Sequence, residues 1–312
     1  MSDPRGRLVG ASLLALGAAF LWASYYPLVL KYAAGATPIE VLAWPFVVGG
    51  AAFVGLATFQ GHGSAVGALY RDRGAWVRLG LLLGMQAAVL ASTYLAGAVD
   101  TSLLSLLGDV VATPILLVLI FSEGAGRIRS PSFLTGIVVC TAGAVLTIAA
   151  GGAIRPLTAV SLPIGVLVPV VIGLYFLLMA RASRSVPLAA VVGQVTVTAG
   201  LLLLIAGLAD PAATGSLIPD GAGPAIALAA IGLTSFFLGP ALYFLAIERA
   251  GLVLPAVLMA TIPVFTLLLS WLLLGAVPPV LGLAGIPIAV GGALWALRGE
   301  HAPWTPSYGS GA

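Results

Sequence analysis

Asp109 is an acidic residue near the middle of a long apolar run of the sequence. A charge in the hydrocarbon core of a membrane costs at least about 2.5 kcal/mol, so such residues usually face a bundle interior or a water-filled cavity. A carboxylate at this depth can pair with the ammonium group of a solute or carry a proton. The structural alternative is a protonated or capping carboxyl tied to neighbouring backbone, with Gly108 allowing close packing. The sequence leaves both interpretations open.

Uncharged polar and aromatic residues occur at similar depth in other apolar runs. Trp22 and Gln86 lie near the middle of their runs, and Gln194 lies in an end third. A tryptophan at mid-depth lies outside the interfacial belt and offers both an apolar face and an N–H donor. The alternatives are packing or lipid contact for Trp22, and for each glutamine an interhelical hydrogen bond of ~0.6 kcal/mol, which we favour for Gln194. The predicted lining of a solute cavity is Trp22, Tyr25, Gln86, Asp109 and Gln194.

Four tyrosines lie toward the ends of apolar runs. Tyr26 and Tyr94 lie toward one membrane face, and Tyr175 and Tyr243 lie toward the other. We interpret them as a mirrored pair of gates, each able to close over a central cavity. The alternative is the belt of interfacial aromatic residues that is common at both faces of membrane proteins.

Prolines are frequent in the apolar runs, with 21 in the whole chain. A proline removes one backbone hydrogen bond and kinks a helix. In a membrane, the freed carbonyl group needs another partner or a wet cavity. We predict Pro27, Pro114 and Pro263 as hinge positions; the alternative for any such proline is a static bend that widens the bundle.

These side chains are held by helices, because the composition is that of a membrane protein. The 312 residues are 61% hydrophobic and only 7% charged, whereas a soluble domain carries about a quarter of charged residues. The apolar runs match the roughly 20 residues that an α-helix needs to cross the bilayer. The first run lacks a convincing small-residue cleavage site, so we expect it to be retained as a helix. The predicted fold is an all-α integral membrane protein with ten transmembrane helices.

The basic residues give an orientation. With ten helices, alternate loops face opposite sides, and of the 13 Lys and Arg residues only Lys31 and Arg155 fall on the second side. The others, Arg78 among them, flank helices on the first side, so the positive-inside rule places both termini in the cytoplasm. The expected helices cover residues 8–31, 38–59, 77–98, 101–121, 131–150, 161–181, 188–209, 224–246, 252–274 and 279–297.

The sequence also contains a weak internal repeat. A single ungapped shift places Tyr26 on Tyr175 and Tyr94 on Tyr243, and it superimposes several expected helix starts. Fixed-period self-similarity of this kind indicates that a structural unit is repeated.

The repeat divides the chain into two halves of five helices each. We expect a first repeat over 1–153, a second over 154–298 and a flexible cytoplasmic tail over 299–312. Because five is odd, the second repeat enters the membrane from the opposite side. Inverted repeats of this kind are typical of secondary transporters, which bind solute near the midplane and work by alternating access.

Several motifs give the chain a resemblance to a known family. They are LWASYYP at 21–27, TPIEVLAW at 37–44, ATIPVFTLLLSWLLLG at 260–275 and the glycines Gly285 and Gly292. In this order and spacing they resemble the ten-helix EamA-type branch of the drug/metabolite transporter superfamily.

Two positions depart from that pattern. The branch usually has an arginine where this chain has Pro45, and a glutamate where it has Ala276. The second departure resembles bacterial exporters of aromatic and other amino acids. The resemblance therefore implies an exporter or facilitator of small solutes, amino acids including neutral and aromatic ones, in the bacterial inner membrane. Exporters of another metabolite or of drugs, and a channel, are the alternatives.

Other functional classes lack the residues they need. There is no P-loop, so transport would be driven by a gradient. The two histidines, His62 and His301, lie in an expected loop and the tail, so an intramembrane enzyme is disfavoured. We expect no catalytic residue, no metal and no cofactor. The expected partners are a small-molecule substrate and membrane lipids, without nucleic acid, in a monomer or weak dimer.

Overall fold

All regular structure in the part of the chain that the computed structural model describes is helical. The described residues are 4–33, 36–96, 98–108, 112, 115–116, 119–120, 130–150, 161–183, 185–209, 219, 221–250, 253–276 and 280–297. Asp109, Pro114 and the tail over 299–312 lie outside them.

The helices follow one another in the order of the apolar runs. The first group is α1 (Pro4–Tyr32), α2 (Pro38–Phe59), α3 (Gly63–Leu69), α4 (Arg73–Ala96), α5 (Ala98–Leu107) and α8 (Pro131–Ala150). The second group is α9 (Ser161–Ala182), α10 (Leu188–Ala209), α12 (Ala222–Leu233), the π-helical turn η2 (Thr234–Leu238), α13 (Gly239–Ala250), α14 (Val253–Leu258), the 3₁₀ turn η3 (Met259–Thr261), α15 (Ile262–Leu274) and α16 (Val280–Leu297).

The chain is a multi-pass membrane protein. Within the described residues, five helices are long and apolar enough to cross a bilayer, over Gly6–Tyr32, Pro38–Phe59, Arg73–Leu95, Leu188–Ala209 and Ala222–Ala250. Further, shorter apolar helices cover Pro131–Thr147, Leu167–Met179, Met259–Leu274 and Val280–Ala296. Because residues 108–121 are described only at scattered positions, the count of ten helices stays a prediction. The short helix α3 was not predicted.

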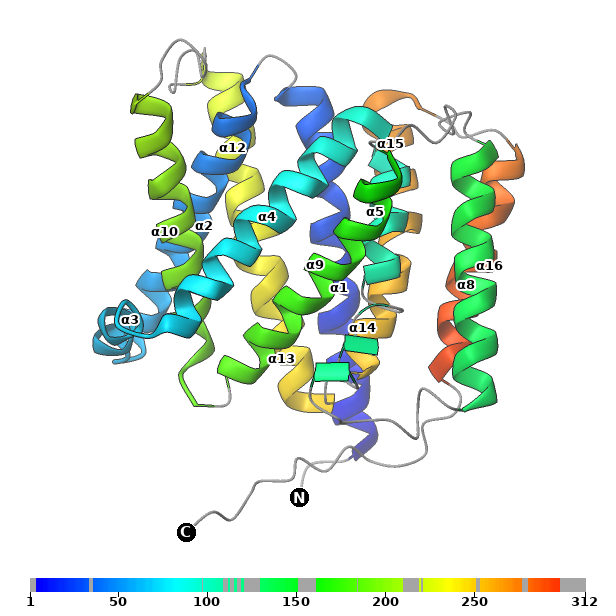
Figure 1. The fold of residues 1–312 in the computed structure, drawn as a ribbon, viewed down its shortest axis with the longest axis horizontal. Coiled ribbons are helices and arrows are strands. Elements are labelled where there is room, and N and C mark those ends of the chain that lie inside the picture. Colours follow the sequence, from blue (N-terminus) through cyan, green and yellow to red (C-terminus); the bar gives the residue numbers. More distant parts are fainter. Residues whose placement is uncertain are drawn as a thin grey trace.

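The helices form one bundle with a pair standing at one side (Figure 1). Helices α8 and α16 pack against each other at that side, while α2, α10 and α12 pack together at the opposite side. Helices α1, α5 and α9 lie between them. The first turn of α1 and the last turn of α16 lie at the same end of the bundle.

Glycines allow the close approach of α2 to α10 and of α8 to α16. A Cβ atom on Gly50 would overlap the backbone of Val197, and one on Gly292 would overlap the backbone of Cys140. Small residues at such crossings let helix backbones come close enough for dispersion contact, which is the main attraction between helices in lipid.

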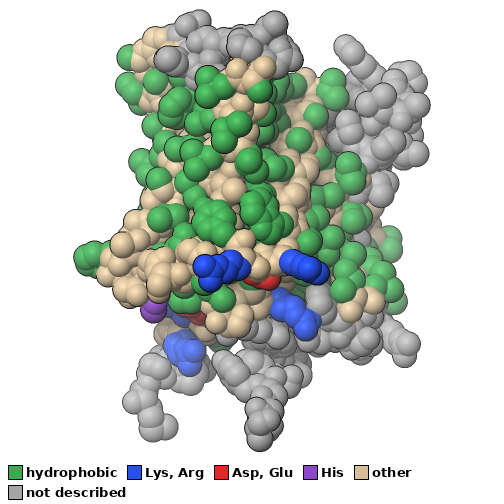
Figure 2. All heavy atoms as spheres, turned by 60° about the vertical axis from the view of Figure 1, so that its left-hand side comes forward, with side chains coloured by type: hydrophobic (Ala, Val, Ile, Leu, Met, Phe, Trp, Pro, Cys, Tyr) green, Lys and Arg blue, Asp and Glu red, His purple; other side chains and the backbone are tan. Residues whose placement is uncertain are grey.

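The outer surface is apolar over a broad band. Figure 2 shows hydrophobic side chains covering much of one face, with Lys and Arg gathered at one end of it. Large apolar side chains such as Phe59 and Val280 are almost fully exposed. A surface of this kind needs a lipid environment, because contiguous apolar patches of this extent are rare on soluble monomers.

The TPIE sequence begins α2 with a capping box. The Thr37 hydroxyl accepts a hydrogen bond from the Glu40 N–H, and the Glu40 carboxylate accepts one from the Thr37 N–H. Pro38 occupies the first turn, where its missing N–H is not needed. Glu40 therefore has a structural role at the start of α2.

Candidate functional site

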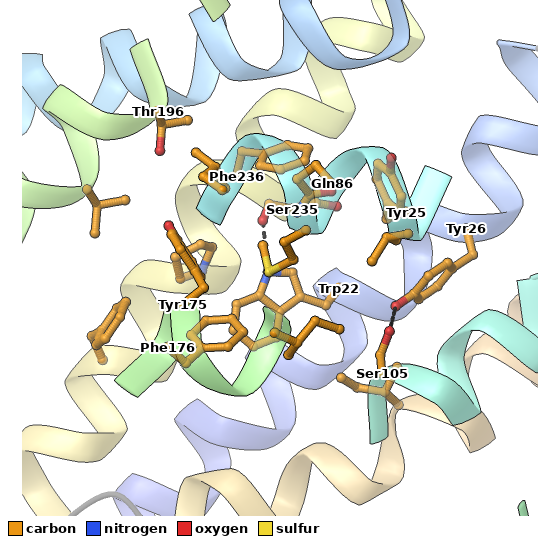
Figure 3. Close-up of a pocket in the computed structure, with 18 residues that line it drawn as sticks. Trp22, Tyr25, Tyr26, Gln86, Ser105, Tyr175, Phe176, Thr196, Ser235 and Phe236 are labelled. Atoms are coloured by element: carbon orange, nitrogen blue, oxygen red, sulfur yellow. Dashed lines mark hydrogen bonds between the residues drawn. The ribbon is translucent and has the colours of Figure 1, made fainter. Parts of the chain in front are cut away.

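A cavity lies in the centre of the bundle, between α1, α4, α9, α10 and the η2–α13 segment (Figure 3). The space open to the centres of water molecules is about 100 Å³. A single water needs roughly 10–15 Å³ by this measure, so the cavity has room for several waters or part of a small solute. The lining residues are Trp22, Tyr25, Tyr26, Leu82, Met85, Gln86, Val89, Ser105, Ile172, Tyr175, Phe176, Val192, Thr196, Ser235, Phe236, Pro240, Phe244 and Ile262.

Trp22 of α1 is the largest side chain in this wall. Its indole ring contacts the rings of Phe176 and Tyr243, with centroids 5.5 and 5.2 Å apart. Its N–H donates a hydrogen bond of 2.8 Å to the backbone carbonyl of Ser235. Trp22 therefore joins α1 to both α9 and the η2–α13 segment at the level of the cavity.

The carbonyl of Ser235 is free to accept this bond because η2 is a π-helical turn that runs into Pro240. The Gly239 N–H bonds to the Thr234 carbonyl, five residues back. In the same pattern the Ser235 carbonyl would pair with residue 240, and a proline has no N–H. The indole N–H of Trp22 takes that place.

Two further details fix this contact. The Ser235 hydroxyl donates to the backbone carbonyl of Leu21 at 3.2 Å, so α1 and η2 each donate a hydrogen bond to the other. A Cβ atom on Gly239 would lie 2.9 Å from the Trp22 Nε1 atom, so a glycine is needed where the indole approaches. Single-turn π segments often occur at functional sites.

On the opposite side of the cavity, Tyr26 connects α1 to α5 (Figure 3). The hydroxyls of Tyr26 and Ser105 lie 3.0 Å apart. Because the Ser105 hydroxyl donates to the Thr101 carbonyl, the Tyr26 hydroxyl is the donor to Ser105. This bond joins α1 to α5 at the cavity wall.

The Tyr25 hydroxyl is buried in the cavity wall and has no hydrogen-bond partner among the described residues. Its ring packs edge-on against Tyr26 and Phe236, with centroids 5.5 and 5.9 Å apart. A buried hydroxyl without a partner costs about 1–3 kcal/mol. It is therefore a group that a polar solute or a water molecule would satisfy.

The structure brings together most of the described residues that the sequence predicts as cavity or gate. Trp22, Tyr25, Tyr26, Gln86 and Tyr175 all line the same cavity. Tyr175 and Thr196 lie on one side of it, with Tyr26 and Ser105 on the other (Figure 3).

Three other predicted residues lie outside the cavity lining. Tyr243 is buried behind the wall and contacts Trp22. Tyr94 is 42% exposed near the C-terminal end of α4. Gln194 is fully buried in α10, and its amide atoms have no partner among the described residues. Gln194 therefore neither lines the cavity nor makes the expected interhelical hydrogen bond with a described residue, while Val192 and Thr196 of the same helix line the cavity.

The two described hinge candidates have different settings. Pro27 is buried within α1, which is continuous over Pro4–Tyr32. Pro263 lies in the first turn of α15, directly after the 3₁₀ turn η3. A 3₁₀ turn between two α-helical segments often marks a hinge, so the irregular backbone lies just before this proline.

The sequence treats Arg78 as a helix-flanking residue of the orientation signal, whereas the structure buries it. Its side chain is 9% exposed, and its Nη2 atom lies 2.9 Å from the carboxylate of Asp72. The backbone N–H of Gly74 and the guanidinium of Arg78 both lower the pKa of Asp72 below its ordinary value.

Other residues of the cavity wall, such as Phe176, Phe236 and Ser105, were not predicted from the sequence. The sequence does not show which helix faces meet.

Tyr26→Phe is expected to lower the free energy of unfolding by about 1 kcal/mol, because it removes one buried hydrogen bond. Ser105→Ala should cost a similar amount, and the double variant little more than either single one. Thermal unfolding of the purified protein in detergent measures this, with Tyr32→Phe as an exposed control. Fully additive losses would contradict a direct Tyr26–Ser105 bond.

The described residues hold no group of three or more His, Cys, Asp or Glu side chains suited to a metal ion.

No curated protein matches the chain. Twelve chains of solved structures match it. One, described only as the crystal structure of a protein, has 23% sequence identity and a TM-score of 0.69 and is aligned over 92% of this chain and 96% of its own.

That similarity concerns the fold. The sequence match is to a family: residues 161–298 match the EamA-like transporter family. This segment covers α9 to α16 and supplies Tyr175, Phe176, Thr196 and Ser235 to the cavity. The second half of the chain thus carries a match to the EamA-like transporter family of the drug/metabolite transporter superfamily.

Proposed function

We propose that this protein is a secondary transporter of small organic solutes. The observation that carries the proposal is the central cavity, walled by aromatic side chains from both halves of the chain. The family match over 161–298 supports a transporter of small solutes. The proposal assigns no catalytic step to any residue.

We further propose that the chain is an inverted repeat, with halves over 1–153 and 154–298. The contacts between helices support this division. The repeat relates α1 to α9 and α4 to α13, and correspondingly α1 packs on α13 while α4 packs on α9. The mates α2 and α10 pack on each other, as do α8 and α16. Such pairing is expected when two similar units meet about a pseudo-two-fold axis.

The proposed solutes are amino acids, including neutral and aromatic ones. The rings of Trp22, Phe176 and Phe236 supply apolar walls, and aromatic pairs gain ~0.5–1.5 kcal/mol beyond area burial. The Gln86 amide and the unpartnered Tyr25 hydroxyl supply hydrogen-bonding groups beside them. An exporter of another amphipathic metabolite or of drugs would use the same wall.

The proposed gate residues are Tyr26 and Tyr94 toward one membrane face and Tyr175 and Tyr243 toward the other. The bond from Tyr26 to Ser105 supports a closing contact between α1 and α5. Pro27 and Pro263 are the proposed hinges among the described residues. We propose a bacterial inner membrane location with cytoplasmic termini, because basic side chains gather at one end of the face in Figure 2.

Flux of labelled phenylalanine, leucine and glutamate into proteoliposomes containing the purified protein tests the proposal. We expect saturable flux of the first two solutes, with and without a pH gradient to reveal proton coupling. Liposomes without protein provide the background. Flux that rises linearly with concentration would indicate a channel. Absence of flux for every amino acid would refute the proposed cargo.

A further inference from the structure

Arg78 lies on the side of α4 that lines the cavity. Leu82, Met85, Gln86 and Val89 of this helix all line it, and Arg78 precedes Leu82 by one helical turn on the same face. Helical side chains lean toward the N-terminus of their helix, so the guanidinium extends from the cavity toward the start of α4. Arg78 itself is not among the residues that line the cavity; it lies one helical turn before Leu82, on the side of Asp72.

The buried guanidinium of Arg78 has a donor without a partner in the part of the chain that the structure describes. Its Nη2 atom donates to Asp72 at 2.9 Å, while its Nε–H has no partner among the described residues. A guanidinium has five N–H donors in a planar fork. Leaving such donors unpaired in a buried place is unfavourable, so the site has capacity for another oxygen ligand.

The partner of Arg78 is the more exposed of the pair. The Asp72 side chain is 48% exposed, against 9% for Arg78. Asp72 also has a second role, because its carboxylate accepts the Gly74 N–H at the start of α4 at 2.9 Å. An exposed carboxylate on a short connection exchanges for water or another anion more readily than a buried one, since surface ion pairs contribute little net stability.

Tyr175 lies on α9, which packs against α4, the helix of Arg78. Its side chain lines the cavity. Its ring contacts Phe176 at 5.3 Å between centroids, and Phe176 in turn contacts Trp22 at 5.5 Å. A continuous row of rings therefore leads from Tyr175 to Trp22 along the cavity wall.

We propose that Arg78 binds the carboxylate of the solute, whose apolar part lies against Phe176 and Trp22. This deepens the proposed transport function and rests on it for the identity of the solute. Guanidinium groups can bind carboxylates through two parallel N–H···O bonds, whereas Asp72 accepts one such bond, from the Nη2 atom of Arg78. The solute carboxylate would replace or join that of Asp72, so Arg78 makes the site selective for carboxylates over neutral molecules of the same shape.

Equilibrium binding of 3-phenylpropionate and of its amide, 3-phenylpropionamide, to the purified protein tests this. The two probes have nearly the same shape and differ in charge. We expect the protein to bind the carboxylate at least tenfold more tightly than the amide. Arg78→Met should remove this preference, so that the acid and the amide bind with affinities within about twofold of each other. Arg78→Lys should keep part of it, because the charge remains but the planar fork does not.

Asp72→Asn separates ligand binding from a structural role. If Arg78 binds the solute, this variant retains the carboxylate preference or strengthens it, because a competing carboxylate is gone. If Arg78 only caps the start of α4 through Asp72, Asp72→Asn and Arg78→Met behave alike, which would overturn the inference. A wild-type protein without preference for the carboxylate would also overturn it. Should Arg78→Met not fold, the Arg78→Lys and Asp72→Asn variants still decide the question.

Binding and transport report on different claims. A carboxylate preference that depends on Arg78, in a protein that gives no saturable flux, would support the anion site and refute the proposed transport. Saturable flux with equal affinity for acid and amide would support transport and refute the role of Arg78.

Discussion

Gly50→Val is expected to prevent accumulation of the folded protein. A Cβ atom at this position would overlap the backbone N and Cα atoms of Val197 in α10. A backbone atom cannot rotate away as a side chain does, so α2 and α10 would have to separate. Overpacking of a tight core costs typically 1–3 kcal/mol and more where backbone must move, and we expect at least about 3 kcal/mol here.

Gly55→Val is the matched control for this variant. Gly55 lies in the same helix, and a Cβ atom there meets nothing within 4 Å. Size-exclusion chromatography and thermal unfolding in detergent should show a normal monodisperse protein for Gly55→Val, with aggregation or absence of the Gly50→Val protein. Equal behaviour of the two variants would show that α2 and α10 do not approach as closely as described.

Trp22→Ala is expected to reduce transport at least tenfold and to lower stability by about 3–5 kcal/mol, the usual range for large aromatic-to-alanine changes in a packed interior. The variant removes ring contacts to Phe176 and Tyr243 and leaves the Ser235 carbonyl without its donor. A missing partner for a buried acceptor adds to the cost of the lost volume. Flux per folded molecule, measured in proteoliposomes, separates the effect on transport from that on stability.

Two variants serve as controls for Trp22. Trp22→Phe keeps an aromatic wall but loses the N–H, so its flux should lie between those of wild type and Trp22→Ala. Trp271 lies in α15 with its side chain exposed, and Trp271→Ala should change flux less than twofold. Similar losses for Trp22→Ala and Trp271→Ala would show that the central position of Trp22 is not what matters.

The sequence predicted the helices well, because a chain in lipid must hydrogen-bond its backbone groups internally, which few structures allow. Runs of apolar residues of membrane-spanning length become helices whose backbone groups bond internally, and the expected 38–59 and 188–209 match α2 and α10. Polar residues at mid-depth, above all Trp22, Tyr25 and Gln86, also led to the cavity. Such residues stay in a membrane helix only where protein or water surrounds them.

Rotation about the helix axis could not be predicted in the same way. Gln194 and Thr196 lie two residues apart in α10, yet only Thr196 lines the cavity, since a helix turns by ~100° per residue. From the sequence, Arg78 is only one of the basic residues that indicate orientation. A count of charges does not show which of these side chains point into the bundle. The hydrogen bond between Trp22 and the π turn at Thr234–Leu238 joins residues more than two hundred positions apart in sequence, so no local pattern could reveal it.

The paired hydrogen bonds between Trp22 and Ser235 have a mechanical consequence. Each of the two helical segments donates a hydrogen bond to the backbone of the other. We therefore expect α1 and the η2–α13 segment to behave as one rigid unit. Pulling them apart breaks two bonds together, at roughly 1 kcal/mol each, and exposes a carbonyl that no backbone N–H can recover. Such a doubly bonded contact resists separation of α1 from the η2–α13 segment, so these two parts are expected to move together when the bundle changes shape.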